Sequence, residues 1–80
     1  MKANRAFELI VSRDSGEPAF LADPQRLDRI EVVSVADGEV VLFWERPPEA
    51  ASRLVRALRA DLYALEPREF LARWSSVESG

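Results

Sequence analysis

Two apolar runs rich in β-branched residues flank the dipeptide Asp37–Gly38, and this arrangement constrains the fold more than any other feature of the chain. The first run covers residues 30–36 and the second covers residues 39–44. Asp-Gly between such runs favours a two-residue type I′ turn, in which both turn residues adopt positive φ. The pattern predicts an antiparallel hairpin, so the fold must be built around a sheet.

A two-residue turn at this position fixes which residues of the two runs face each other. The predicted cross-strand pairs are Val35 with Val40, Val33 with Leu42, and Glu31 with Trp44. The same register sets Arg29 against Arg46, so regular pairing should end inside these like charges. One face of the hairpin then carries five apolar side chains: Val33, Val35, Val40, Leu42 and Trp44. The other face carries Ile30, Val32, Val41 and Phe43 with Ser34 and Glu39, so both faces are largely apolar.

The chain before this hairpin also has the pattern of extended structure. Apolar and polar residues alternate over much of residues 7–12, which predicts a strand, and residues 13–18 supply turn formers. A short second strand is predicted over residues 19–22. Asp23–Pro24 has an N-cap residue before a proline, which predicts one helical turn over residues 24–28.

The second half of the chain is predicted to form two helices. Pro47 and Pro48 end the sheet region, and a helix follows from Pro48–Glu49 to about Leu65. Its predicted core-facing stripe consists of Ala51, Leu54, Val55, Leu58, Leu62 and Leu65. Pro67 begins a shorter helix, whose apolar face consists of Phe70, Leu71 and Trp74.

These elements predict one α+β domain over residues 6–74. An antiparallel sheet of three or four strands precedes two C-terminal helices, which pack on one of its faces. Residues 1–5 and 75–80 are expected to be flexible termini.

Composition argues against an enzyme. The chain has no histidine and no cysteine, which removes the commonest general base, the thiolate nucleophile and the soft metal ligands. Its three glycines, Gly16, Gly38 and Gly80, make no phosphate-binding loop, so we expect no cofactor. Glu31 is the best candidate for a general acid, because the predicted register sets it on an apolar face, but no second catalytic group accompanies it.

Charge and hydropathy exclude two further classes of partner. The net charge of −3 disfavours attraction to nucleic acid or to anionic lipid. The longest uncharged apolar run, Val40–Trp44, is too short to span a membrane or to form a signal-peptide core. We therefore expect a cytoplasmic protein.

The two-faced hairpin suggests a protein-interaction or accessory domain, because one layer of helices covers only one face of a sheet. The predicted interaction residues are Ile30, Val32, Val41 and Phe43. We expect them to form a homodimer, while a larger protein partner remains possible. In the competing interpretation, the second helix or the first strand covers this face within the chain.

The long helix offers a second, weaker candidate surface. Arg53, Arg56, Arg59 and Tyr63 face away from the leucine stripe, where they could meet a phosphate or an acidic partner. Glu49 precedes Arg53 by four residues and is expected to pair with it, so we favour a solvated helix face.

Three remaining patterns have weak functional interpretations. Ala50, Ala57 and Ala64 recur every seven residues with Ala60 nearby, which could admit a partner helix, although alanine is also simply the best helix former. A small molecule could alternatively bind in an apolar pocket between sheet and helices, lined by Trp44, Phe43 and Tyr63. In the first turn, Asp14, Ser15 and Glu17 lack the spacing of a calcium loop.

Overall fold

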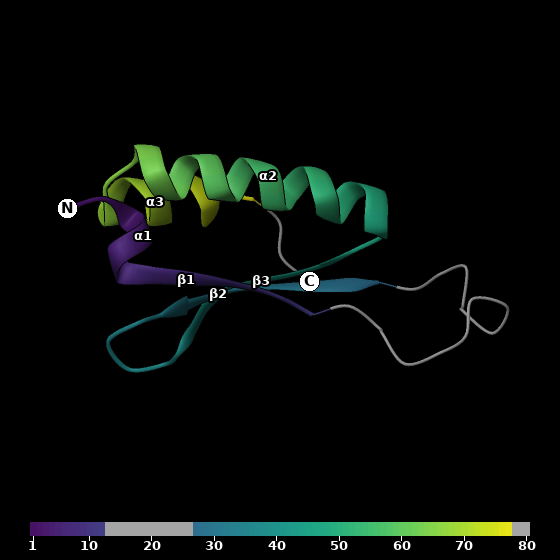
Figure 1. The fold of residues 1–80 in the computed structure, drawn as a ribbon, viewed down its shortest axis with the longest axis horizontal. Helices are drawn as coiled ribbons and strands as arrows, with labels where there is room; N and C mark the ends of the chain where they lie inside the picture. The colour runs from purple at the N-terminus through teal and green to yellow at the C-terminus, as the bar shows by residue number, and fades with distance from the viewer. Residues whose placement is uncertain (13–26, 78–80) are drawn as a thin grey trace, which may run out of the picture.

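The fold has two layers, a three-stranded sheet below and helices above it (Figure 1). This computed structural model describes residues 1–12 and 27–77. In chain order the elements are α1 (Ala3–Ala6), β1 (Phe7–Ser12), β2 (Asp28–Ser34), β3 (Val40–Arg46), α2 (Pro48–Ala64) and α3 (Pro67–Trp74). The predicted α+β class is confirmed, with an antiparallel sheet followed by two C-terminal helices. The turn predicted over 13–18, the strand over 19–22 and most of the helical turn over 24–28 lie outside the described residues.

The predicted hairpin is present, but its turn is longer than two residues. Gly38 has a φ of +74°, whereas no other described residue has a positive φ, so Asp37 does not adopt the conformation that a type I′ turn requires. The loop closes through bonds from Ser34 N–H to Glu39 O and from Gly38 N–H to Ser34 O, both 2.8 Å. The Asp37 carboxylate also accepts the Glu39 N–H at 3.0 Å. This side-chain bond makes Asp37 a turn former without positive φ.

A β-bulge in β3 corrects the predicted register. Val33 pairs with Val40 but Val32 pairs with Leu42, so Val41 is the extra residue on its strand. Beyond the bulge, Ile30 lies opposite Trp44. The predicted pairs of the two-residue turn are therefore wrong. The longer loop sets Val33 opposite Val40 instead of Leu42, and the bulge then exchanges the faces of every side chain beyond it.

The corrected register also removes the like-charge pair that was expected at the open end of the hairpin. Arg29 lies opposite Glu45, and Asp28 lies opposite Arg46. Opposite charges across neighbouring strands stabilise a pair where like charges would repel. Regular pairing consequently runs to the end of both strands.

The core lies between the sheet and the helices. Ile30, Val32 and Trp44 have no exposed surface, and they project from the sheet toward Leu58 of α2 and Phe70 of α3. Aromatic contacts join the two layers. The Trp44 and Trp74 rings meet edge to face at 5.9 Å between centroids, and the rings of Phe7 and Phe70 stack at 5.7 Å.

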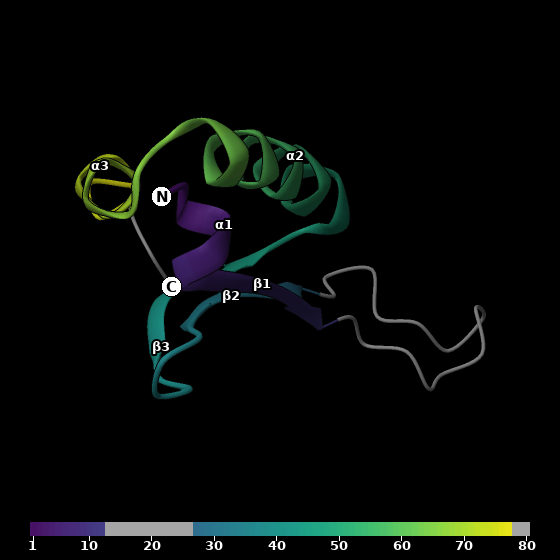
Figure 2. The same ribbon diagram turned by 60° about the vertical axis from the view of Figure 1, so that its left-hand side comes forward.

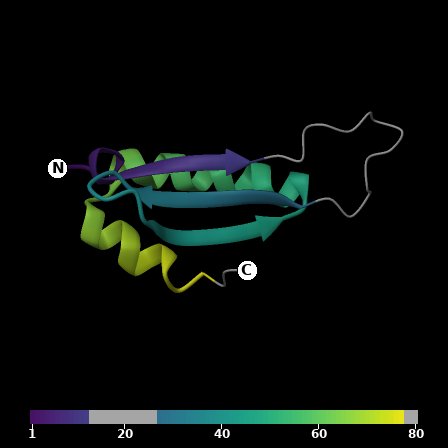
Figure 3. The same ribbon diagram turned by 90° about the horizontal axis from the view of Figure 1, so that it is seen from below.

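The predicted apolar faces of both helices are confirmed. Ala51, Leu58 and Leu62 of α2 are buried, while Leu54, Val55 and Leu65 pack against the core with part of their surface exposed. On α3, Phe70 and Trp74 are buried and Leu71 is partly buried. Two of the three strands, β1 and β2, lie in front of α2 when the sheet is seen from below, and α3 lies on the side of β3 (Figure 3).

Ala3, near the N-terminus, belongs to this core. Ala3 has no exposed surface, and its N–H donates to Leu65 O at 2.8 Å. Lys2 Nζ donates to Ala64 O at 3.2 Å. These donors satisfy carbonyl groups at the C-terminal end of α2, where helical partners are lacking. Figure 2 shows α1 rising from β1 toward the helix layer, between α2 and α3.

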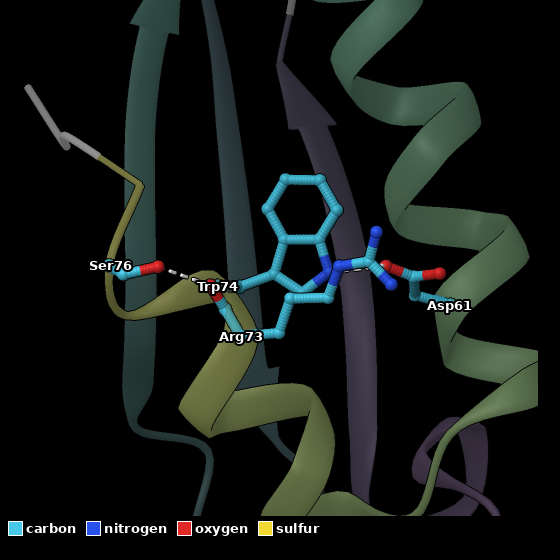
Figure 4. A network of polar contacts seen from close by, with 4 residues as sticks. All are labelled: Asp61, Arg73, Trp74 and Ser76. Atoms are coloured by element: carbon cyan, nitrogen blue, oxygen red, sulfur yellow. Dashed lines mark hydrogen bonds and ion pairs between the residues drawn. The ribbon is translucent and has the colours of Figure 1, made fainter.

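Asp61 attaches α3 to α2 (Figure 4). Its Oδ2 atom accepts a hydrogen bond from Trp74 Nε1 at 2.9 Å and lies 3.4 Å from Arg73 Nε. The Trp74 side chain is nearly buried, while the Arg73 side chain is 64% exposed. The indole bond is therefore the more valuable of the two, because a buried donor without an acceptor costs more than an exposed ion pair contributes.

Replacing Ile30 by alanine tests the corrected register. Ile30→Ala should lower the free energy of unfolding by about 2–5 kcal/mol, because it leaves a cavity in the core. The matched variant Ile10→Ala, at a residue 39% exposed on the other sheet face, should cost less than about 1 kcal/mol. Urea unfolding followed by tryptophan fluorescence measures both. Equal losses would contradict the assignment of faces.

Removing the Asp61 carboxylate tests the attachment of α3. Asp61→Ala should cost about 1–3 kcal/mol, because the Trp74 indole N–H then has no acceptor. Arg73→Gln should change stability by no more than about 1 kcal/mol. Chemical denaturation gives the energies, and the indole N–H resonance of Trp74 reports loss of the bond. An unchanged resonance in Asp61→Ala would refute the interaction.

Candidate functional site

The helices lie on one side of the sheet, and the described elements leave the opposite face uncovered (Figures 1 and 3). We call it the outer face. Strand alternation and the pairing register assign nine side chains to it: Glu8, Ile10 and Ser12 of β1, Arg29, Glu31 and Val33 of β2, and Val41, Phe43 and Glu45 of β3. The apolar members, Ile10, Val33, Val41 and Phe43, range from half-buried to exposed.

Only two of the four predicted interaction residues lie on this face. Val41 is 38% exposed and Phe43 is half-buried there, but Ile30 and Val32 have no exposed surface and face the helices. The bulge at Val41 is the physical reason, since it sets Leu42 and Trp44 on the same face as Ile30 and Val32. The interaction surface predicted from sequence is thus divided between opposite faces of the sheet.

Ile10 and Val33 also lie on the outer face, although they were not among the interaction residues predicted from sequence. The charges at the open end of the hairpin indicate the register that places them there. Shifting the register by one residue exchanges the unfavourable Arg29–Arg46 pair for the favourable Arg29–Glu45 pair, and the same shift turns Ile30 inward.

Charged side chains divide the apolar part of the outer face. Glu31 lies between Ile10 and Phe43 in neighbouring strands, and the Arg29 guanidinium carbon lies 5.2 Å from the centre of the Phe43 ring. This distance is typical of a cation–π contact. Glu31 is half-buried and opposes Phe43, not Trp44. The predicted pairing of Glu31 with Trp44, on which its role as a general acid depended, is therefore wrong.

The second candidate surface, on α2, is exposed as predicted. Arg53, Arg56, Arg59 and Tyr63 all face solvent, and the Tyr63 residue is 69% exposed. Among the described residues, no carboxylate lies within ion-pair distance of these three guanidinium groups. The expected pair between Glu49 and Arg53 is accordingly absent.

The aromatic residues proposed to line one pocket lie in three places. Trp44 has no exposed surface, Phe43 lines a hollow of about 230 Å³ at the edge of β3, and Tyr63 lines another of about 360 Å³ beside β1. A hollow of about 420 Å³ lies between α2 and α3, with Ala57, Ala60 and Trp74 in its lining. The geometry therefore does not bring Trp44, Phe43 and Tyr63 together around a ligand.

Within residues 1–12 and 27–77, no cluster of three or more Asp, Glu, His or Cys side chains could hold a metal ion. In the same part of the chain, no helix has the length and apolar character needed to cross a membrane. The turn residues Asp14, Ser15 and Glu17 lie outside the described ranges.

Comparison with known proteins does not assign a family to the chain. No protein-family model, curated protein or solved structure matches the chain.

Proposed function

We propose that this chain is a small protein-interaction domain, without enzymatic activity, that self-associates through the outer face of its sheet. The observation that carries the proposal is the uncovered face itself, where Ile10, Val33, Val41 and Phe43 remain at least partly accessible. Accessible apolar side chains gathered on one face are typical of association surfaces. Since the chain has no cysteine, a reducing compartment suits it, and we propose the cytoplasm.

A second copy of the chain is a suitable partner because the β2–β3 half of the outer face is self-complementary. A two-fold axis running parallel to the strands, between β2 and β3, sets β2 of one copy against β3 of the other. Arg29 then meets the partner's Glu45, and Val33 meets the partner's bulge at Val40 and Val41. Each contact occurs twice, as in any isologous interface.

The same arrangement accommodates the carboxylate at the centre of the face. Glu31 meets the partner's Phe43, over which the partner's Arg29 is held within its own chain. The carboxylate therefore approaches a guanidinium instead of the other copy's Glu31. An axis through β2 would instead bring the two Glu31 side chains together, which like-charge repulsion disfavours.

The size of the face predicts a reversible dimer. The two strands that face the partner under this axis, spaced about 4.8 Å apart and about 23 Å long, cover roughly 220 Å² in plan. A standard stable interface buries about 800 Å² on each partner, so this face alone is small. We expect dimers that dissociate on dilution, and an accessory role in which a larger protein could add to the interface.

Absolute mass by light scattering tests the proposal. The parent chain should approach twice its mass of 9.0 kDa at high concentration and return to the monomer mass on dilution. Val41→Lys should remain monomeric throughout, because it places a charge in the interface. Val35→Lys is the matched control, since Val35 is 59% exposed in the hairpin loop, outside the strands that carry the outer face. A stable monomer at every concentration would reject self-association.

A charge exchange tests the position of the two-fold axis. Arg29→Glu should weaken the dimer at least tenfold, because it sets like charges against the partner's Glu45. The double variant R29E/E45R should restore most of the loss, and it also preserves the opposite charges across β2 and β3 within each chain. Thermal unfolding shows whether each variant keeps its fold. A folded R29E that dimerises normally would contradict this axis.

A further inference from the structure

We propose that the open edge of β1 binds an extended, acidic peptide segment, which adds to the sheet as a fourth strand beneath α2. This surface is separate from the outer face, so the inference goes beyond the proposed self-association. It depends on three features: backbone groups of β1 that no described residue pairs, a hollow along that strand, and arginines over the hollow.

The backbone of β1 is available for pairing on one side. β1 is at the edge of the described sheet, with β2 as its neighbour. Val35 N–H donates to Ala6 O at 3.0 Å, which fixes the alternation along the strand. Residues 8, 10 and 12 direct their N–H and C=O groups toward β2, whereas Phe7, Leu9 and Val11 direct theirs toward the open edge. An edge of this kind is a template for another strand.

One hollow lies at this edge, between β1 and α2, and a second adjoins it on α2. One, of about 360 Å³, is lined by Phe7 and Leu9 of β1 and by Leu62, Arg59 and Tyr63 of α2, among others. The next, of about 290 Å³, is lined by Ser52, Val55, Arg56 and Arg59. Both hollows are lined by Arg59, and we call the two together the groove; its apolar lining includes Leu9, Val55 and Leu62. A strand added to β1 would direct every second side chain into this groove.

The charge over the groove favours a carboxylate-bearing occupant. Arg56 and Arg59 have no ion-pair partner among the described residues, although the chain as a whole has a net charge of −3. Glu8 is the only carboxylate of the two linings, and its side chain is assigned to the outer side of the sheet. Glutamate at alternate groove-facing positions of the added strand would meet the arginines, and an aliphatic side chain between them would cover Leu9 and Leu62.

At strand-addition sites, main-chain hydrogen bonds provide affinity and side-chain pockets provide specificity. Main-chain hydrogen bonds to Phe7, Leu9 and Val11 would hold the segment, while the groove would select its alternate side chains. Self-association through the outer face leaves these bonds unused, so either interaction can exist without the other.

Amide hydrogen exchange with a defined peptide tests the inference. The probe is a blocked seven-residue peptide with threonine at alternate positions and glutamate or valine, in turn, at the others. At ten times its dissociation constant, it should slow exchange of the Leu9 and Val11 N–H groups about tenfold. The N–H groups of Glu8 and Ile10, which already bond to β2, should change little. Two further peptides are N-methylated, one on the odd-numbered and the other on the even-numbered backbone nitrogens. If the peptide adds as a strand, only one of these two sets bonds to β1, so one of the two peptides must lose binding. Binding through side chains alone would not distinguish them.

Arginine variants test the charge requirement. R56Q/R59Q should weaken peptide binding about fivefold. Arg53→Gln removes one positive charge from the same helix at a residue that lines neither hollow, so it should leave affinity unchanged. No protection at millimolar peptide, or equal binding of both methylated peptides, would overturn strand addition. Equal binding of a lysine-for-glutamate peptide would overturn the acidic assignment. If the Leu9 and Val11 N–H groups became protected from exchange at high protein concentration without peptide, the edge would bind a second copy of the chain instead.

Discussion

The bulge at Val41 is the constraint on which the rest of the structure depends. By inserting one residue into β3, it directs Leu42 and Trp44 to the same side as Ile30 and Val32. Only in that arrangement does the sheet present a single large apolar face for α2 and α3 to cover. Without the bulge, Trp44 and Ile30 would point in opposite directions, and one layer of helices could not bury both.

The extent to which sequence predicts this fold differs between its helices and its sheet. The six apolar positions of α2 follow the helical period without interruption, so their shared face could be predicted from residue spacing alone. The hairpin had an equally clear signal in Asp37–Gly38, but local turn preference did not determine its register. Burial of Trp44 with Ile30 is a long-range requirement, and it prevailed over the shortest turn.

The same limitation applies to the candidate surfaces. The exposure of Arg53, Arg56, Arg59 and Tyr63 followed from helical geometry, since the opposite side of α2 is apolar. Which residues lie on the outer face depends on the register of the hairpin, so the predicted positions of Ile30 and Val32 are both wrong. Nothing in residues 1–5 predicts α1, because its helix has four residues and its main connection is the distant bond from Ala3 to Leu65. Such a contact is invisible to any local pattern.

The bond between Lys2 and Ala64 spans 62 positions, and α1 also packs against both C-terminal helices, so the order in which the chain is synthesised matters for folding. All three strands leave the ribosome before α2 and α3. At about 5–20 residues per second, the helices follow over roughly 1–5 s. During that interval the side of the nascent sheet that carries Ile30 and Trp44 has no cover, and α1 has nothing to pack against. The sheet therefore cannot bury its core face until the C-terminal helices are available, because only they cover Ile30 and Trp44 and contact α1.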